Sequence, residues 1–310
     1  MRLFNTLGIT CLSALFILQG CKRDEVINTK SLADFFQENG VPDQFFTINT
    51  DTVSYFVTTN YTGVLVDSGA FVNSSNEIVI GPVTIRLKEM ITKKDMILSG
   101  IFPVAGGQPL VSGGEFYIEA IKNGEKLRLA RPNAITLGIP CKDTIPKTNY
   151  RGFYETNLTA ETDWGTPSDT IVPFSNGMAG PGSVSGFYYD FTVDSLAWIN
   201  CDHFYSAGGV MTDIKANVIG SQYIESNTKV FLAFTDENSA SYMSKESGLY
   251  VPSGGYQLPL GLNITFVAIS IVNGQYYSAF QSTSVTPGHI ENLNLSPTTL
   301  DDFKTQLENL

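Results

Sequence analysis

The densest group of chemically versatile side chains is the run Ala197–Phe204, which holds Trp198, Asn200, Asp202 and His203 within six residues. Asp202 beside His203 could form a general base and the group that orients it. Adjacent residues of a strand point to opposite faces of a sheet, so in a strand these two side chains could not hydrogen-bond directly. We therefore expect a structural role, with Trp198 in a core and Asn200 and Asp202 satisfying a turn.

Motifs for nucleophilic, phosphate and metal chemistry are missing from the sequence. Only His203 and His289 occur, and no Gly-x-Ser-x-Gly elbow stands in a strand–turn–helix context. The Gly-rich run 180–186 lacks the lysine of a phosphate-binding loop and is expected to be a turn. A glycan hydrolase with a carboxylate pair stays open as an alternative, since the 30 acidic residues offer many pairs. We expect a protein that is not an enzyme and that uses no metal or cofactor.

Aromatic side chains are the best candidates for ligand contact, because they can stack on sugar rings or anchor a protein partner. Trp164 is followed by Gly and Pro, which indicate an exposed loop. Tyr188, Tyr250 and Tyr256 complete the predicted contact set. The alternative is that these tyrosines close the ends of strands and contact no ligand.

The first 21 residues form a pattern of one charge, an apolar stretch and a cysteine. Arg2 is its only charge, residues 7–18 are apolar, and Leu18-Gln19-Gly20-Cys21 precedes a charged segment. Twelve apolar residues are too few for a stable membrane-spanning helix but suit a signal peptide. The pattern resembles the lipobox of bacterial lipoproteins, which implies that residues 1–20 are removed and that Cys21 receives a diacylglycerol. An ordinary secretory signal or a buried apolar helix is the alternative.

The residues after the lipobox bear on where the protein sits. Asp24 and Glu25 resemble the acidic surface-export signals of Bacteroidetes lipoproteins, which implies an outer-membrane protein of the cell envelope, with surface exposure as a further implication. Loss of residues 1–20 would remove Arg2 and change the net charge from −11 to −12. That charge argues against nucleic acid as a partner and against a basic patch for anionic lipid. The expected membrane contact is therefore the N-terminal lipid anchor.

Two cysteines would remain after processing. Cys11 leaves with the signal and Cys21 is acylated, so Cys141 and Cys201 are expected to form a disulfide in the oxidising envelope. Closing a loop of about 60 residues would stabilise the fold by roughly 4 kcal/mol. Neither cysteine has a His or a second Cys at the spacing of a metal site.

Four short segments combine an aspartate, a hydroxyl residue and an apolar residue. They resemble the O-glycosylation motif of Bacteroidetes, and their hydroxyl residues are Thr52, Thr144, Thr170 and Ser195. We expect sugar on one or more of them.

Abundant Val, Ile, Thr, Tyr and Phe in short segments divided by Gly and Pro predict an all-β protein. A tether and a short helix over residues 21–43, capped at Ser31 and packed on the first domain, lead into a β-sandwich over 44–135. Its strongest hairpin turns at Asn123-Gly124. Segments 63–66, 69–72 and 81–90 resemble a ZU5-type β-sandwich. Self-cleavage, known in some ZU5 domains, is not implied, because this domain has no His.

The rest of the chain is expected to form a second β-sandwich. A proline-rich connection over 136–150 precedes this domain, which covers 151–295 and includes a hairpin at Asn273-Gly274 and a polar loop over 236–252. Residues 296–310 predict a C-terminal helix opened by Ser296-Pro297. The overall expectation is a lipid-anchored, non-catalytic envelope protein that binds a protein or glycan partner, with the envelope glycan hydrolase as the alternative.

Overall fold

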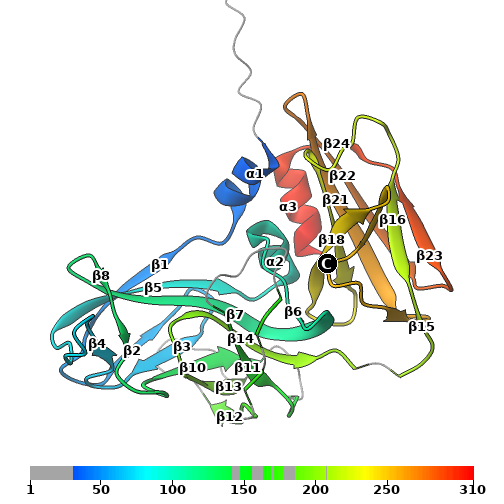
Figure 1. Cartoon of the computed structure of the whole chain (residues 1–310). Coiled ribbons are helices and arrows are strands. Elements are labelled where there is room, and N and C mark those ends of the chain that lie inside the picture. The colour runs from blue at the N-terminus through cyan, green and yellow to red at the C-terminus, as the bar shows by residue number, and fades with distance from the viewer. Residues whose placement is uncertain are drawn as a thin grey trace, which may run out of the picture.

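The computed structural model describes residues 31–141, 147–155, 163–165, 167–168, 171–177, 186–206 and 208–310. Within them the fold is all-β, as predicted, and it has a third short helix besides the two that the sequence predicted near its ends (Figure 1). Two sheets packed face to face form the first unit, and one large sheet covered by helices forms the second.

The first unit is a β-sandwich. Its seven-stranded sheet runs in the order β1 (Gln44–Asn49), β5 (Pro82–Met90), β7 (Gln108–Lys122), β14 (Ala197–Phe204) and β11 (Arg151–Glu155), with β6 (Val104–Ala105) and β8 (Glu125–Lys126) added to β7. Its five-stranded sheet runs in the order β12 (Phe174–Gly177), β13 (Gly186–Val193), β10 (Ile135–Pro140), β3 (Gly63–Val66) and β2 (Ser54–Val57). A small pair, β4 (Phe71–Val72) and β9 (Arg128–Leu129), lies beside them.

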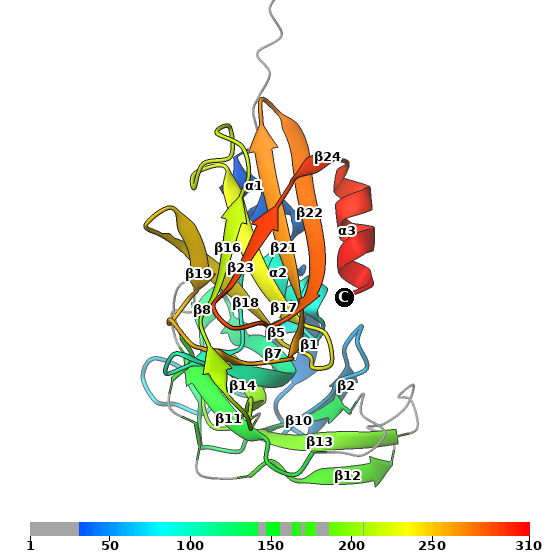
Figure 2. The same ribbon diagram turned by 90° about the vertical axis from the view of Figure 1, so that its right-hand side faces the viewer.

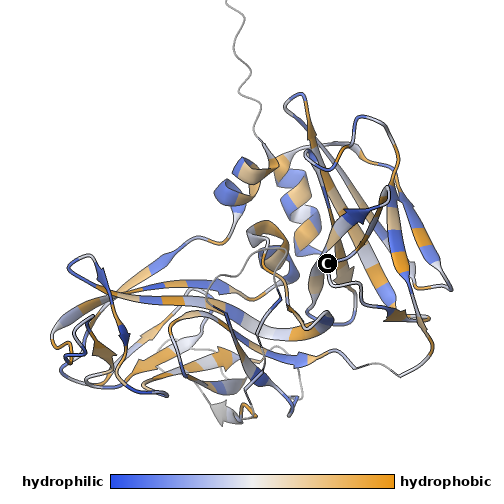
Figure 3. Ribbon diagram, viewed as in Figure 1, coloured by the Kyte–Doolittle hydropathy of each residue, from blue (hydrophilic) through white to orange (hydrophobic). Residues whose placement is uncertain are grey.

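The sandwich core follows from period-two alternation. Val83, Ile85 and Leu87 of β5 are buried against residues of the opposite sheet such as Val64 and Phe191. The residues between them on β5 face outward, and Figure 3 shows the alternating apolar and polar bands along the strands. Burying one face of each sheet against the other is the source of this unit's stability.

Strand pairing corrects the predicted domain boundaries. The expected connection over 136–150 contains most of β10, which pairs with β3 and β13. β14, assigned from sequence to a second sandwich, pairs with β7 over Ala197–Phe204. The first unit therefore extends to about residue 204, and the ZU5-like segment over 44–135 is only part of it.

The second unit is an eight-stranded sheet rather than a second sandwich. Its order is β23 (His289–Leu293), β16 (Ile214–Val218), β19 (Leu249–Pro252), β18 (Ala240–Glu246), β17 (Thr228–Phe234), β21 (Asn263–Val272), β22 (Gln275–Ser284) and β24 (Ser296–Thr298). β15 (Met211–Thr212) and β20 (Leu258–Pro259) form a separate pair. The sheet curls, so that β23 approaches β21 and one face encloses its own core (Figure 2).

Three helices cover the other face of the eight-stranded sheet. They are α1 (Leu32–Asn39), α2 (Lys93–Ser99) and α3 (Leu300–Glu308). Phe35 of α1, Ile97 of α2 and Phe303 of α3 share one core with Val267 of β21. α1 has the predicted capping box at Ser31, but it packs on this sheet and not on the first unit. α2 lies between β5 and β6 in the chain, so a segment of the first unit forms part of the second (Figure 1).

Local turns were predicted well, and longer connections were not. Asn123-Gly124 and Asn273-Gly274 both take the two positive φ values of a type I′ turn. The segment predicted as a polar loop over 236–252 instead contains strands β18 and β19. The last helix begins after Thr299, whose side chain caps it, because 296–298 add a strand to the sheet.

Candidate functional site

The four aromatic residues predicted to contact a ligand are all buried. Trp164 is 2 % exposed, Tyr188 2 %, Tyr250 1 % and Tyr256 8 %. The prediction of an exposed contact set is therefore wrong for all four. The physical reason is that each ring fills an interior space that the sequence pattern did not reveal.

Trp164 shows how a loop residue becomes a core residue. Its backbone nitrogen donates to the carbonyl of Val104 at 2.8 Å, and its indole nitrogen donates to the carbonyl of Phe102 at 3.0 Å. The ring packs with Met90 and Phe153 in a small core on the outer face of the seven-stranded sheet. Tyr256 in the second unit is fixed likewise by a hydrogen bond with Ser241.

The expected disulfide is not formed. The structure joins no sulfur of Cys141 to Cys201 among the residues it describes. Cys141 follows β10 in one sheet, and its Sγ lies 3.5 Å from the hydroxyl of Tyr189. Cys201 belongs to β14 in the opposite sheet and is fully buried, and burial raises the pKa of its thiol. The two side chains instead serve as packing elements of the sandwich core.

Two of the residues predicted to be glycosylated or acylated are exposed, and the other three lie outside the described residues. Thr52 and Ser195 are exposed, Thr52 between β1 and β2 and Ser195 between β13 and β14. Cys21, Thr144 and Thr170 lie outside the described residues. Glycosylation and acylation stay predictions.

The run around Asp202 forms a buried polar cluster inside strand β14, not in a turn. Asn200 donates from Nδ2 to Asp202 Oδ2 at 2.5 Å, and both side chains are wholly buried. A bulge lies between them opposite Ser112 and Glu115 of β7. Burial raises the pKa of Asp202 well above its usual range, although hydrogen bonds from Asn200, Ser112 and the Gly113 backbone oppose the rise.

Glu115 lies beside this cluster and is fully buried as well. Neither of its carboxyl oxygens has a hydrogen-bond partner among the described residues. Burial, followed by the negative potential of Asp202 and Asp95, raises the pKa of Glu115 well above its usual value. His203 points away from Asp202, and its ring makes an edge contact with Tyr150 at 4.9 Å. This carboxyl pair is sealed from solvent, so it can act on stability but not on a dissolved substrate.

An open cleft of about 500 Å³ lies among the residues that the structure describes, and we call it the helix–sandwich cleft. It lies where α1, α2 and α3 meet the start of β1 and the turn between β2 and β3. Its lining residues are Glu38, Asn39, Gly40, Val41, Pro42, Gln44, Thr59, Asn60, Glu89, Lys94, Asp95, Leu98 and Lys304.

Glu89 is the buried carboxyl in the lining of this cleft. It accepts hydrogen bonds from Thr58 Oγ1 at 3.0 Å, from Thr62 Oγ1 and from Gln44 Nε2 at 3.4 Å. Burial raises the pKa of Glu89, while the bonds from Thr62 and Thr58 oppose the rise. Glu89 continues the inward-facing positions of β5, so a charged residue stands where alternation expects an apolar one. That break in the pattern is the sequence signal that could have revealed the site.

The other charges of the cleft are largely committed to the fold. Asp95 accepts from the backbone nitrogens of Ile91 and Thr92 at 3.1 and 3.0 Å and so caps α2. Lys94 pairs with Glu308 of α3. Among the described residues, no three or more His, Cys, Asp or Glu side chains gather closely enough to hold a metal ion.

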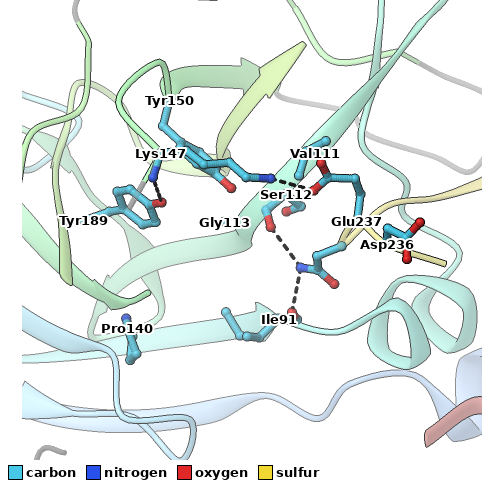
Figure 4. A pocket seen from close by; sticks show the side chains of 11 residues that line it. Ile91, Val111, Ser112, Gly113, Pro140, Lys147, Tyr150, Tyr189, Asp236 and Glu237 are labelled. Carbon is cyan, nitrogen blue, oxygen red and sulfur yellow. Dashed lines mark hydrogen bonds and ion pairs between the residues drawn. The ribbon is translucent and has the colours of Figure 1, made fainter. Parts of the chain in front are cut away.

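A second, smaller cavity of about 80 Å³ lies between the two units (Figure 4). Asn238 crosses it and donates from Nδ2 to the carbonyls of Ile91 at 3.0 Å and Ser112 at 2.9 Å. Lys147 Nζ pairs with Glu237 at 2.6 Å on the other side. This space is too small for more than a few waters, so it is a joint between the units rather than a ligand site.

No family model matches the chain, and no curated protein matches it. In the part of the chain that the structure describes, none of the helices has the length and apolar character needed to span a membrane. Fold and site together define an all-β protein with an open polar cleft between its helices and its sandwich.

Proposed function

We propose that this chain is a lipid-anchored, non-catalytic protein of the cell envelope that binds a glycan or protein partner. The lipobox-like end at Cys21 supports the anchor. The helix–sandwich cleft supports binding and is the observation that carries the proposal. Its volume lies within the range of small-molecule and oligomer sites, about 300–1,000 Å³.

The cleft lining favours a hydroxyl-rich ligand, and a glycan segment has that chemistry. Asn60 offers an exposed amide that can both donate and accept hydrogen bonds, and the amides of Asn39 and Gln44, which each make bonds within the protein, line the cleft beside it. Val41 and Pro42 offer an apolar edge. Acidic and basic side chains are mixed in the lining, so neither a polyanion nor a polycation is favoured. The same cleft could instead bind a flexible polar segment of a partner protein, which is the second ligand class that we propose.

Binding can be tested with the purified protein, a panel of envelope and dietary glycans, and isothermal titration. Asn60→Ala removes one exposed amide of the cleft, and loss of one net hydrogen bond is expected to weaken binding about tenfold. Asn294→Ala, an exposed asparagine of the second unit, is the matched control and should bind as the parent. Equal affinity for both variants would reject the cleft as the binding site.

A second candidate, glycan hydrolysis, is favoured by one observation. The buried Glu89 has a raised pKa, as the general acid of a glycosidase requires, and Glu38 lines the same cleft. New reducing ends in the same glycan panel would support it. Glu89→Gln would then abolish the release while Asn294→Ala would not. No release from any glycan bound in the cleft would reject hydrolysis.

The anchor and the location have their own tests. Intact mass of the membrane protein should show a diacylglycerol on Cys21, and Cys21→Ser should release the protein from membranes. Protease shaving of intact cells, with lysed cells as control, should remove the described domains if they face outward. Protection until lysis would direct the search for partners to the periplasm.

A further inference from the structure

The loop between β16 and β17, residues 219–227, presents two isoleucines to solvent. Ile219 is 44 % exposed and Ile224 is 52 % exposed. Tyr223, which precedes Ile224 in the loop, is buried instead. The centre of its ring lies 5.7 Å from the centre of the Tyr277 ring on β22. The loop is thus attached by its tyrosine while its isoleucines stay outside.

Hydrogen bonds give this loop a defined shape. Asn227 accepts at Oδ1 from the backbone nitrogen of Ile224 at 2.9 Å, and it donates from Nδ2 to the carbonyl of Gln222 at 3.0 Å. Its own carbonyl accepts from Ser270 Oγ at 2.8 Å and from the nitrogen of Ile271 at 3.0 Å, both on β21. The exposed isoleucines are therefore held out by a fixed loop.

The loop lies at the same end of the second unit as the start of the described chain. Figures 1 and 2 both place it at the end of the sheet where the β21–β22 hairpin turns and where α1 begins, and in Figure 1 α1 lies on the opposite side of the sheet from the loop. Ser31 opens that helix, and it lies only ten positions after Cys21, with the nine residues 22–30 between them. A segment of ten residues reaches at most about 35 Å when fully extended. An acyl chain on Cys21 would hold this end close to the bilayer.

We propose that the loop 219–227 rests on the lipid bilayer to which the chain is anchored, with Ile219 and Ile224 in the interfacial region. The proposal rests on the proposed acylation of Cys21. Short apolar side chains on a fixed loop bury into the boundary between headgroups and acyl chains, as amphipathic surface segments do. Contact there orients the protein, with the second unit toward the membrane and the sandwich away from it.

The charged side chains at this end of the second unit determine which lipid headgroups the loop can approach. Glu225 lies in the loop itself, and Asp301 and Asp302 are exposed on the first turn of α3. These carboxylates disfavour an anionic surface, so the contact suits a zwitterionic one. Burial of the exposed parts of two isoleucines favours the contacting orientation by roughly ten- to a hundredfold, which orients a tethered protein but does not recruit a free one.

The test uses the acylated full chain in phosphatidylcholine vesicles that carry lipids spin-labelled near the headgroup. Ile224→Trp reports the loop, and Val210→Trp reports a site next to β15, at the other end of the second unit, where Val210 is 69 % exposed. The native Trp164 and Trp198 give the background of the parent protein. We expect the added fluorescence of Ile224→Trp to shift to the blue and to be largely quenched, and that of Val210→Trp to be unchanged.

A second arm separates this inference from the anchor itself. The mature chain, with a hexahistidine tag in place of Cys21, is held on vesicles containing a nickel-chelating lipid, whether or not the native protein is acylated. Quenching of Ile224→Trp alone in this arm supports the loop contact even if intact mass shows no diacylglycerol. Equal quenching of both variants, or of neither, in the tethered state overturns it. Quenching that appears only when a partner protein is added would assign the loop to that partner and also overturns it.

Discussion

Glu115 offers a sharp test of how the buried carboxyl groups affect stability. A second glutamate on the same face of β7, Glu119, lies beside cations, whereas Glu115 lies near other carboxyl groups. Glu115 is wholly buried, with Asp202 and Asp95 as the nearest charges. Glu119 has cations beside it: Arg86 at 3.4 Å and Lys126 in an ion pair. Replacing each by glutamine keeps the shape and removes the charge.

The sign of the effect follows from the pKa of each carboxyl. Burial raises the pKa of Glu115, so the folded protein keeps a proton that the unfolded chain loses above the ordinary carboxyl range. The free energy of unfolding is then highest in acid and falls as the pH rises, by about 1.4 kcal/mol per pH unit for each such proton. Glu115→Gln should remove this slope. It should match the parent near pH 4 and exceed its stability by more than about 1 kcal/mol at pH 7.

Glu119→Gln should do the reverse. Partial burial works to raise its pKa, but hydrogen bonds and charge from Lys126, with further bonds from Tyr117 and Arg86, outweigh it and lower the pKa of Glu119. Its stabilisation is present above the ordinary carboxyl pKa and is lost as the pH falls. The variant should therefore be less stable than the parent at pH 7 and approach it in acid.

The assay is urea unfolding of parent and variants between pH 4 and pH 8, followed by fluorescence and by circular dichroism. Coincident transitions from both probes would justify a two-state treatment. If Glu115→Gln loses stability at pH 7, the carboxyl is ionised and compensated in the fold, and our account of the cluster is wrong. The same conclusion would follow if the two glutamine variants changed stability in the same direction.

Three further predictions concern close packing and hydrogen bonds within the fold. Trp164→Ala should lower the free energy of unfolding by about 3–5 kcal/mol, since it empties a core site and removes a hydrogen bond, and denaturant unfolding will show it. Gly254→Ala should destabilise by more than about 1 kcal/mol, because its φ is +83° and an added Cβ would lie 2.8 Å from the Cα of Gly107; a drop in melting temperature checks it. Asn238→Ala should remove about 1–3 kcal/mol by deleting two hydrogen bonds to the backbone carbonyls of Ile91 and Ser112, whereas Lys147→Ala at the partly exposed ion pair should change less than about 1 kcal/mol. If Asn238→Ala and Lys147→Ala lowered the free energy of unfolding by similar amounts, the idea that Asn238 holds the two units together would be wrong.

Local chemistry made part of this fold predictable. The type I′ turns at Asn123-Gly124 and Asn273-Gly274 need two positive φ values that few other residue pairs adopt. The capping box at Ser31 is equally local. Strand alternation on β5 indicates its buried face, because only one side of that strand meets the sandwich core, whereas β17 is buried on both faces. These features depend on residues within a few positions of one another.

Long-range pairing was not predictable from the same patterns. β14 joins the first unit because it pairs with β7, some 80 positions earlier in the chain. The residues of β14 carry no pattern from which this partner strand could be predicted. Trp164 lies in a loop-like composition, yet composition does not tell whether a loop folds back over a sheet. The cleft around Glu89 escaped prediction because residues from three helices and two strand ends build it.

The helical layer on the eight-stranded sheet has a consequence for how the protein reaches its folded state. Its three helices begin at Leu32, Lys93 and Leu300, so the layer draws on both ends and on the middle of the chain. The layer cannot close until α3, which begins at Leu300, has been synthesised and can pack beside α1 and α2. Until then the apolar face of β17 and β21 stays uncovered and available to chaperones or to other chains. Separating the two units after about residue 204 would also leave α2 with the sandwich, so the helix-covered face of the eight-stranded sheet is complete only when both units are in one chain.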